Sequence, residues 1–137
     1  MPSGPSINSA IEIHDSVLSS VEQQGAKTIL RLTPAYIHKS DGIPGVDNGS
    51  GWVQDAIVTI DGSMAEVAVL EYPVDLAKGV LEIDGRQTSN MIPLPLSHKG
   101  SVSLKLMTQR SGTLRITGSA IHVELLGAPE YVEEFTR

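Results

Sequence analysis

Histidine and aspartate side chains occur close together at two places in the sequence. His14 is followed by Asp15, and His38 is followed three residues later by Asp41. An imidazole beside a carboxylate can transfer protons or bind a metal ion. Neither place has the spacing of a helical or strand-borne metal motif, so a shared site requires the fold to bring them together. The alternative is that the histidines bond to local backbone at strand ends and the aspartates form turns.

A glycine-rich stretch at residues 36–56 surrounds the second of these places. It also holds Ser40, Asp47 and the only tryptophan of the chain, Trp52. Its aspartates do not follow the calcium-loop spacing, and its glycines lack the Gly-Lys-Ser/Thr ending of a phosphate loop. The glycines therefore indicate turns. Trp52 begins an apolar run, which leaves two roles open: an anchor in the core, or a stacking platform for a flat ligand.

Several kinds of catalytic site are excluded by the residues present. The chain has no cysteine, which rules out thiolate catalysis, disulfides and cysteine-based zinc sites. It also has no Gly-x-Ser-x-Gly nucleophile elbow. The remaining histidines, His98 and His122, are expected in a turn and on the outward side of a strand, where nothing couples them to the others. We therefore expect no catalytic residue, resident metal or cofactor, and the pattern favours a protein that is not an enzyme.

Length, composition and charge bound the class of protein. The 137 residues fit one domain, with a flexible N-terminus expected over 1–8 and a single β domain over 9–137. The net charge of −6 opposes binding to nucleic acid. There is no run of about 18 apolar residues and no signal-like N-terminus, so we expect a cytoplasmic protein without membrane contact.

Short segments that alternate between apolar and polar residues indicate a mainly β fold. They are clearest at 28–33, 53–60, 101–108 and 114–125, with Asp-Gly and Ser-Gly turns beside them. Prolines at every second position within 90–96 place that segment at a sheet edge. The pattern predicts an antiparallel β-sandwich or β-barrel of about eight to nine strands.

The C-terminal residues 127–137 have the features of a short helix. Pro129 stands at a favourable first helical position and is followed by acidic residues. Tyr131 and Phe135 would then lie on the same side of that helix. We expect the helix to dock on one end of the β domain or on a partner protein. A single helical turn is also expected within residues 73–79.

Five segments of the chain form a recognisable pattern: HDS at 14–16, AYIH at 35–38, GW at 51–52, IPLPL at 92–96 and LLGAPEYVEEF at 125–135. This pattern resembles small uncharacterised bacterial all-β proteins of similar length. The first thirty residues are also similar to some immunity-type proteins of bacterial toxin systems, through an unspecific motif. Neither resemblance implies a catalytic residue.

Two kinds of function remain for the candidate residues. The first is a non-enzymatic binding or protein-interaction module that uses the loop at residues 38–52, together with the acidic tail. The alternative is a small-molecule or metal-binding site, with catalysis left open, built from His14, Asp15, His38 and Asp41. A third class, a β-barrel with an apolar ligand inside, requires an unfilled interior. The candidate binding residues are His14, Asp15, His38, Ser40, Asp41, Asp47 and Trp52, while the sequence leaves the oligomeric state open.

Overall fold

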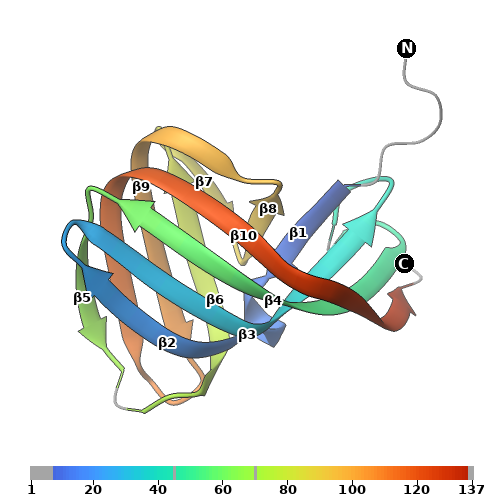
Figure 1. Ribbon diagram of the computed structural model, residues 1–137. Coiled ribbons are helices and arrows are strands. Elements are labelled where there is room, and N and C mark those ends of the chain that lie inside the picture. Colours follow the sequence, from blue (N-terminus) through green and yellow to red (C-terminus); the bar gives the residue numbers. More distant parts are fainter. Residues whose placement is uncertain (1–7, 45, 70, 136–137) are drawn as a thin grey trace.

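Ten strands and one short 3-10 turn make up the part of the chain that the computed structural model describes, residues 8–44, 46–69 and 71–135 (Figure 1). The strands are β1 (Asn8–Glu12), β2 (Val17–Gln24), β3 (Lys27–Ser40), β4 (Gly49–Asp61), β5 (Met64–Ala68), β6 (Val74–Ile83), β7 (Arg86–Ser89), β8 (Met91–Leu94), β9 (Ser97–Thr108) and β10 (Thr113–Phe135). The 3-10 turn, η1 (Ile13–Asp15), joins β1 to β2. Within these ranges there is no helix with the length and apolar character needed to cross a membrane. Of the N-terminus expected to be flexible, residues 1–7 lie outside the described ranges and Asn8 begins β1.

All ten strands belong to one antiparallel sheet that curls into a partial ring. Their order is β2-β6-β9-β10-β4-β3-β1-β8, and β2 also pairs with β3. The shorter strands β5 and β7 pair with β10 and β6. The mainly β, antiparallel class predicted from the sequence is confirmed, with ten strands in place of eight to nine.

The apolar core lies inside the ring and follows the alternation seen in the sequence. Leu30 on β3, Val58 on β4, Leu104 on β9 and Ile116 on β10 each expose at most 1% of their surface. Burying an aliphatic side chain of this size stabilises the fold by about 1.5–3 kcal/mol. These inward-facing rows fix the register of the strands, because a slip of one residue would turn each row toward solvent.

Several predicted turns and edges are confirmed. Asp84 and Gly85 both have positive φ, 50° and 84°, in the tight turn between β6 and β7. β9 and the first part of β10 pair as the expected hairpin, with a register shift at Gly118. The proline-containing strand β8 ends the strand order and is therefore an edge strand.

The predicted C-terminal helix is wrong, because residues up to Phe135 continue β10 as a strand. Tyr131 pairs with Trp52 of β4, and Phe135 pairs with Gly49. A helix of about two turns is marginal on its own, whereas pairing with β4 satisfies the backbone groups of both segments. The helical turn expected within residues 73–79 is also wrong, since β6 runs through it from Val74.

Candidate functional site

One end of the sheet extends beyond the ring (Figure 1), and by their residue numbers all seven candidate binding residues belong to it. It consists of residues 8–15, 35–44, 46–54 and 130–135, which we call the projecting end. A register shift between Leu32 and Ala35 separates the ring part of β3 from the part in the projecting end. β1, β3, β4 and the last part of β10 lie side by side there. The predicted loop is shorter than expected, because its outer residues belong to β3 and β4.

One face of the projecting end is organised around Trp52. The indole Nε1 donates a hydrogen bond to Ser50 Oγ at 2.8 Å. Lys39 Nζ lies 4.6 Å from the centre of the indole ring, within the range of a cation–π contact. Tyr131 of β10 packs against the same ring edge to face, with centroids 5.3 Å apart. Trp52 also packs against the core, which supports the anchor role.

A surface hollow of about 490 Å³ lies beside this face. It is lined by Lys39, Ser40, Asp41, Asn48, Gly49, Ser50, Trp52 and Glu134. Three of the predicted site residues, Ser40, Asp41 and Trp52, therefore share one surface. Ser40 is buried, and its hydroxyl donates to Asn48 O at 2.6 Å and accepts from the Gly42 amide at 3.0 Å. Its role is to hold the loop against the strand ends.

Asp47, a further predicted site residue, organises the loop from within. Its Oδ2 accepts a hydrogen bond from the Ile43 amide at 2.7 Å. Asn8 of β1 donates its side-chain amide to Gly42 O, also at 2.7 Å. The loop presents Ile43 and Val46 to solvent, each about 61% exposed. The tip of the loop is thus apolar and exposed, while Asp47 is used in shaping it.

The opposite face of the projecting end buries His38. The imidazole centroid lies 4.2 Å from that of Phe135 and 5.5 Å from that of Tyr36. Tyr36 donates its hydroxyl to Glu133 Oε1 at 2.8 Å. His38 Nε2 lies 2.8 Å from Glu12 Oε2, but this carboxylate oxygen is out of line with the ring N–H direction. The nitrogen therefore has a close charge partner and no aligned hydrogen bond among the described residues.

Glu12 joins the two histidine sites predicted from the sequence. Besides its contact with His38, it lies with His14 and Asp15 in a group whose nitrogen and carboxylate oxygen atoms are within 4.8 Å of one another. His14 Nδ1 and Asp15 Oδ1 are 3.1 Å apart, and both side chains are exposed. Asp41 lies instead with the Trp52 hollow. Sequence reasoning missed Glu12, whose proximity to His38 depends on the pairing of β1 with β3.

The projecting end is strongly acidic. It holds seven of the sixteen acidic residues but only one of the ten lysines and arginines, so the rest of the chain carries equal numbers of each sign. Burial, followed by the hydrogen bond and charge of Glu133 and the charges of Asp15 and Glu12, raises the pKa of Tyr36 well above its usual range. Desolvation and then the neighbouring Glu134 raise the pKa of Tyr131. Burial is the largest cause of both shifts, and the neighbouring carboxylates add to it on each face.

The last part of β10 has one unpaired side. Residues up to His122 pair with β9 on one side, and from Ala120 to Phe135 the strand pairs with β4 on the other. Beyond the hydrogen bond from the Val123 amide to Leu96 O, no described strand pairs with the β9 side of residues 124–134. Leu125, Leu126, Tyr131 and Val132 are among its exposed side chains. We call this segment the free edge.

Away from the projecting end, the structure brings together a histidine and an aspartate that the sequence did not connect. His98 Nε2 lies 2.7 Å from Asp84 Oδ2, and the Ser101 amide donates to Asp84 Oδ1 at 2.9 Å. The hydrogen bond from His98, followed by that from Ser101, lowers the pKa of Asp84 below its ordinary value. Asp84 in this way ties the β6–β7 turn to β9. The other outlying histidine, His122, is exposed on its strand as expected.

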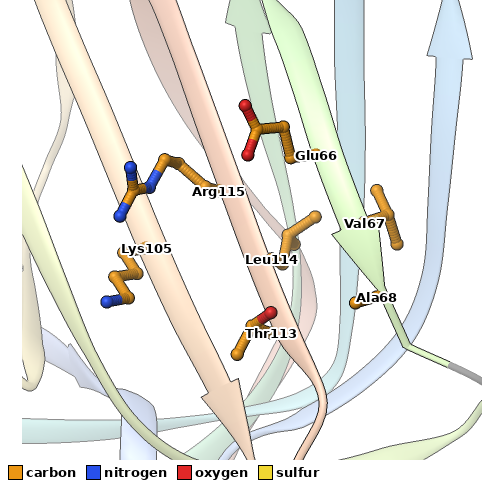
Figure 2. Close-up of a pocket in the computed structure, with 7 residues that line it drawn as sticks. All are labelled: Glu66, Val67, Ala68, Lys105, Thr113, Leu114 and Arg115. Atoms are coloured by element: carbon orange, nitrogen blue, oxygen red, sulfur yellow. The ribbon is translucent and has the colours of Figure 1, made fainter.

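A second hollow, of about 380 Å³, lies on the ring part of the sheet between β5, β9 and β10 (Figure 2). Glu66, Lys105 and Arg115 stand in one cross-strand row beside it. Glu66 and Arg115 are exposed, and no buried unpartnered polar group of the described residues points into the hollow. Ordinary surface side chains account for this arrangement.

Comparison with models of known protein families, with curated proteins and with solved structures found no match. The chain is thus an all-β protein to which no recognised family or named relative can be attached. Its function must be inferred from the geometry of its own surface.

Proposed function

We propose that this protein is a non-enzymatic binding module that recognises an extended, basic segment of a protein partner along the free edge of β10. The observation that carries the proposal is the unpaired side of residues 124–134 within an acidic end of the molecule. A strand edge offers backbone donors and acceptors that an incoming extended peptide can pair with. The proposal retains the loop and the tail as one surface, because both belong to the projecting end.

The acidic charge supports a basic partner in place of a second copy of the chain. The free edge carries four glutamates, Glu124, Glu130, Glu133 and Glu134, and no lysine or arginine, so a second copy would add four more negative charges beside them. Like charges in opposing strand positions are destabilising. Lysine or arginine side chains on the incoming strand would meet these carboxylates, which also speeds association through electrostatic steering. The same charge opposes binding of a phosphate backbone.

The hollow beside Trp52 supplies side-chain recognition next to the edge. Tyr131 and Glu134 of β10 contact or line the same surface as Trp52 and Lys39. A strand added to β10 points alternate side chains toward this face. An aliphatic or aromatic side chain fits against Tyr131, and a cationic one fits near Glu134. Backbone pairing thus provides affinity, while this face selects the sequence.

An interior ligand is a less favoured function. We interpret the partial ring as a β-barrel whose interior is filled by buried side chains of its apolar core, among them Leu30, Val58, Leu104 and Ile116. A barrel of small size is normally packed by its own side chains. The resemblance to small bacterial proteins does not discriminate between these functions, since it implies no activity.

The proposal is tested with a synthetic peptide of about ten residues that alternates lysine and valine. Two controls separate its contributions: a version with glutamate in place of lysine, and a version N-methylated at every residue. Full N-methylation removes the backbone donors on both edges of the peptide and keeps its charge. We expect the lysine peptide to bind, and the N-methylated peptide to bind at least about tenfold more weakly. Equal binding of the lysine and N-methylated peptides would contradict strand addition.

Charge-reversal variants test which surface of the protein binds the peptide. Glu130→Lys combined with Glu134→Lys changes the free edge, whereas Glu66→Lys with Glu71→Lys makes the same change of charge at two exposed sites outside the projecting end. We expect only the first pair to lose peptide affinity, with a weaker dependence on salt for what remains. An equal loss in both would indicate a general charge effect and would refute the location.

A further inference from the structure

We infer that Glu12, His14 and Asp15 form a binding site for a divalent transition-metal ion, for which Zn²⁺ is the representative. One imidazole nitrogen and two carboxylate oxygens lie within 4.8 Å of one another at the turn between β1 and β2. Around a tetrahedral zinc ion such atoms are about 3.4 Å apart. The His14 and Asp15 side chains are 59% and 45% exposed, so small rotations about their side-chain bonds can close the difference.

The backbone that carries these three side chains is held in place. Ser16 is buried, and its hydroxyl donates to Glu12 O at 2.8 Å and accepts from the Tyr36 amide at 3.0 Å. The Ser16 amide closes the turn on Ile13 O, and the Ile13 amide donates to Asn90 O. The ligand positions are therefore fixed by β3 and by the turn between β7 and β8. The backbone therefore loses little conformational entropy when an ion binds, and the entropic cost is confined to the exposed side chains.

A second and independent observation comes from His38. Its side chain is only 5% exposed, and Nε2 has no aligned hydrogen-bond partner although it lies 2.8 Å from Glu12 Oε2. Buried ring nitrogens without such a partner are uncommon and require an explanation. A carboxylate that binds a metal through one oxygen usually accepts a hydrogen bond from a neighbouring group. His38 lies close enough to Glu12 to become this outer partner when the Glu12 carboxylate turns to bind the ion.

The donor atoms define the class of ion. Imidazole suits zinc and other transition metals, whereas calcium prefers six to eight oxygen ligands. Three protein ligands leave at least one position for water or for a group from another molecule. Sulfur ligands are excluded because the chain has no cysteine. The inference is independent of the proposed partner site, since it uses other residues and another ligand.

The test is calorimetric titration of the full chain with zinc chloride, with two histidine variants compared. His14→Ala removes the exposed nitrogen ligand and is expected to weaken binding by at least about tenfold. His98→Ala is the matched control, because His98 also lies against an aspartate, at 2.7 Å, but forms no three-ligand group in the described part of the chain. We expect its affinity for zinc to equal that of the unchanged protein.

The role of His38 is tested by His38→Gln, with folding checked by circular dichroism. Removing the outer hydrogen-bond partner of a metal ligand is expected to lower zinc affinity by about 10- to 100-fold. Nuclear magnetic resonance of the imidazoles provides a readout that does not depend on this buried substitution: zinc is expected to shift His14 and to leave His98 and His122 unchanged. Absence of binding up to about 1 mM zinc would overturn the inference. Equal weakening by His14→Ala and His98→Ala, or equal shifts of all exposed histidines, would also overturn it.

Discussion

Ser16 is expected to contribute unusually strongly to stability for a small polar residue. Its hydroxyl links the Glu12 carbonyl to the Tyr36 amide, and Ser16 itself is 1% exposed. In Ser16→Ala both groups lose this partner, and the Tyr36 amide is too deeply placed for water to replace it. An unsatisfied buried donor costs about 1–3 kcal/mol, so we expect a loss of about 2 kcal/mol. With a urea m value of about 1.5 kcal/mol/M, the unfolding midpoint falls by about 1.3 M.

The chain offers a matched control for this substitution. Ser19 also makes two hydrogen bonds through its hydroxyl, to Arg31 O at 3.1 Å and Thr33 Oγ1 at 2.7 Å, but Ser19 is only partly buried and both bonds are exposed to solvent. Water can replace these bonds, and Ser19→Ala is therefore expected to cost less than about 0.5 kcal/mol. Urea unfolding followed by the fluorescence of Trp52, the only tryptophan, measures both. Equal losses in the two variants would refute the reasoning from burial.

Three further predictions concern packing and charge. A Cβ at Gly51 would overlap the Tyr36 hydroxyl and lie about 3.0 Å from the Phe135 ring. Gly51→Ala is therefore expected to lower the unfolding free energy by about 1–3 kcal/mol, and an unchanged urea midpoint would contradict this packing. Trp52→Ala is expected to cost about 2 kcal/mol and Trp52→Phe less than half of that, because the ring is partly buried against the core; equal losses would argue against the anchor role. The pKa of Asp84 is lower in the folded than in the unfolded chain. Its contribution to folding stability is therefore present above the ordinary pKa of 3.8 and is lost as pH falls through the folded-state pKa. Asp84→Asn is accordingly expected to lower the unfolding free energy at neutral pH but not in strongly acidic solution. A difference in unfolding free energy that stays constant across this pH range would be inconsistent with the pairing of Asp84 and His98.

The strands that could be predicted from the sequence are those whose two sides differ in environment. Residues 53–60 alternate because Ala56, Val58 and Ile60 face the core, and the local pattern carries that information. The Asp84-Gly85 turn was predictable for a similar reason, since positive φ restricts the residues that can occupy it.

The C-terminal part of β10 could not be predicted in this way. Residues 124–134 are all exposed, so no alternation between core and solvent marks them as a strand. Pro129 and the following acidic residues suit the start of a helix equally well. Only the pairing of this segment with β4, distant in sequence, decides its conformation. The two register shifts in that pairing further obscure the period of two.

The candidate site was predicted in its residue types and only in part in its arrangement. The turn at His14 and Asp15 could be read from the sequence, but their connection to His38 passes through Glu12. That connection requires the register in which Ala10 pairs with His38 and Glu12 pairs with Tyr36. The link between Asp84 and His98 has the same cause, because it joins residues fourteen positions apart.

The central claim, that the free edge of β10 accepts an extended basic segment, is tested most directly by amide hydrogen exchange of residues 124–134, of which all but Pro129 have an amide hydrogen. Without peptide, amides directed toward β4 should exchange slowly, and those directed toward the free edge should exchange rapidly. Adding the lysine–valine peptide should slow exchange at the second set, while the N-methylated peptide should have little effect. Rapid exchange of that second set at saturating lysine–valine peptide, or protection confined to other strands, would contradict the claim.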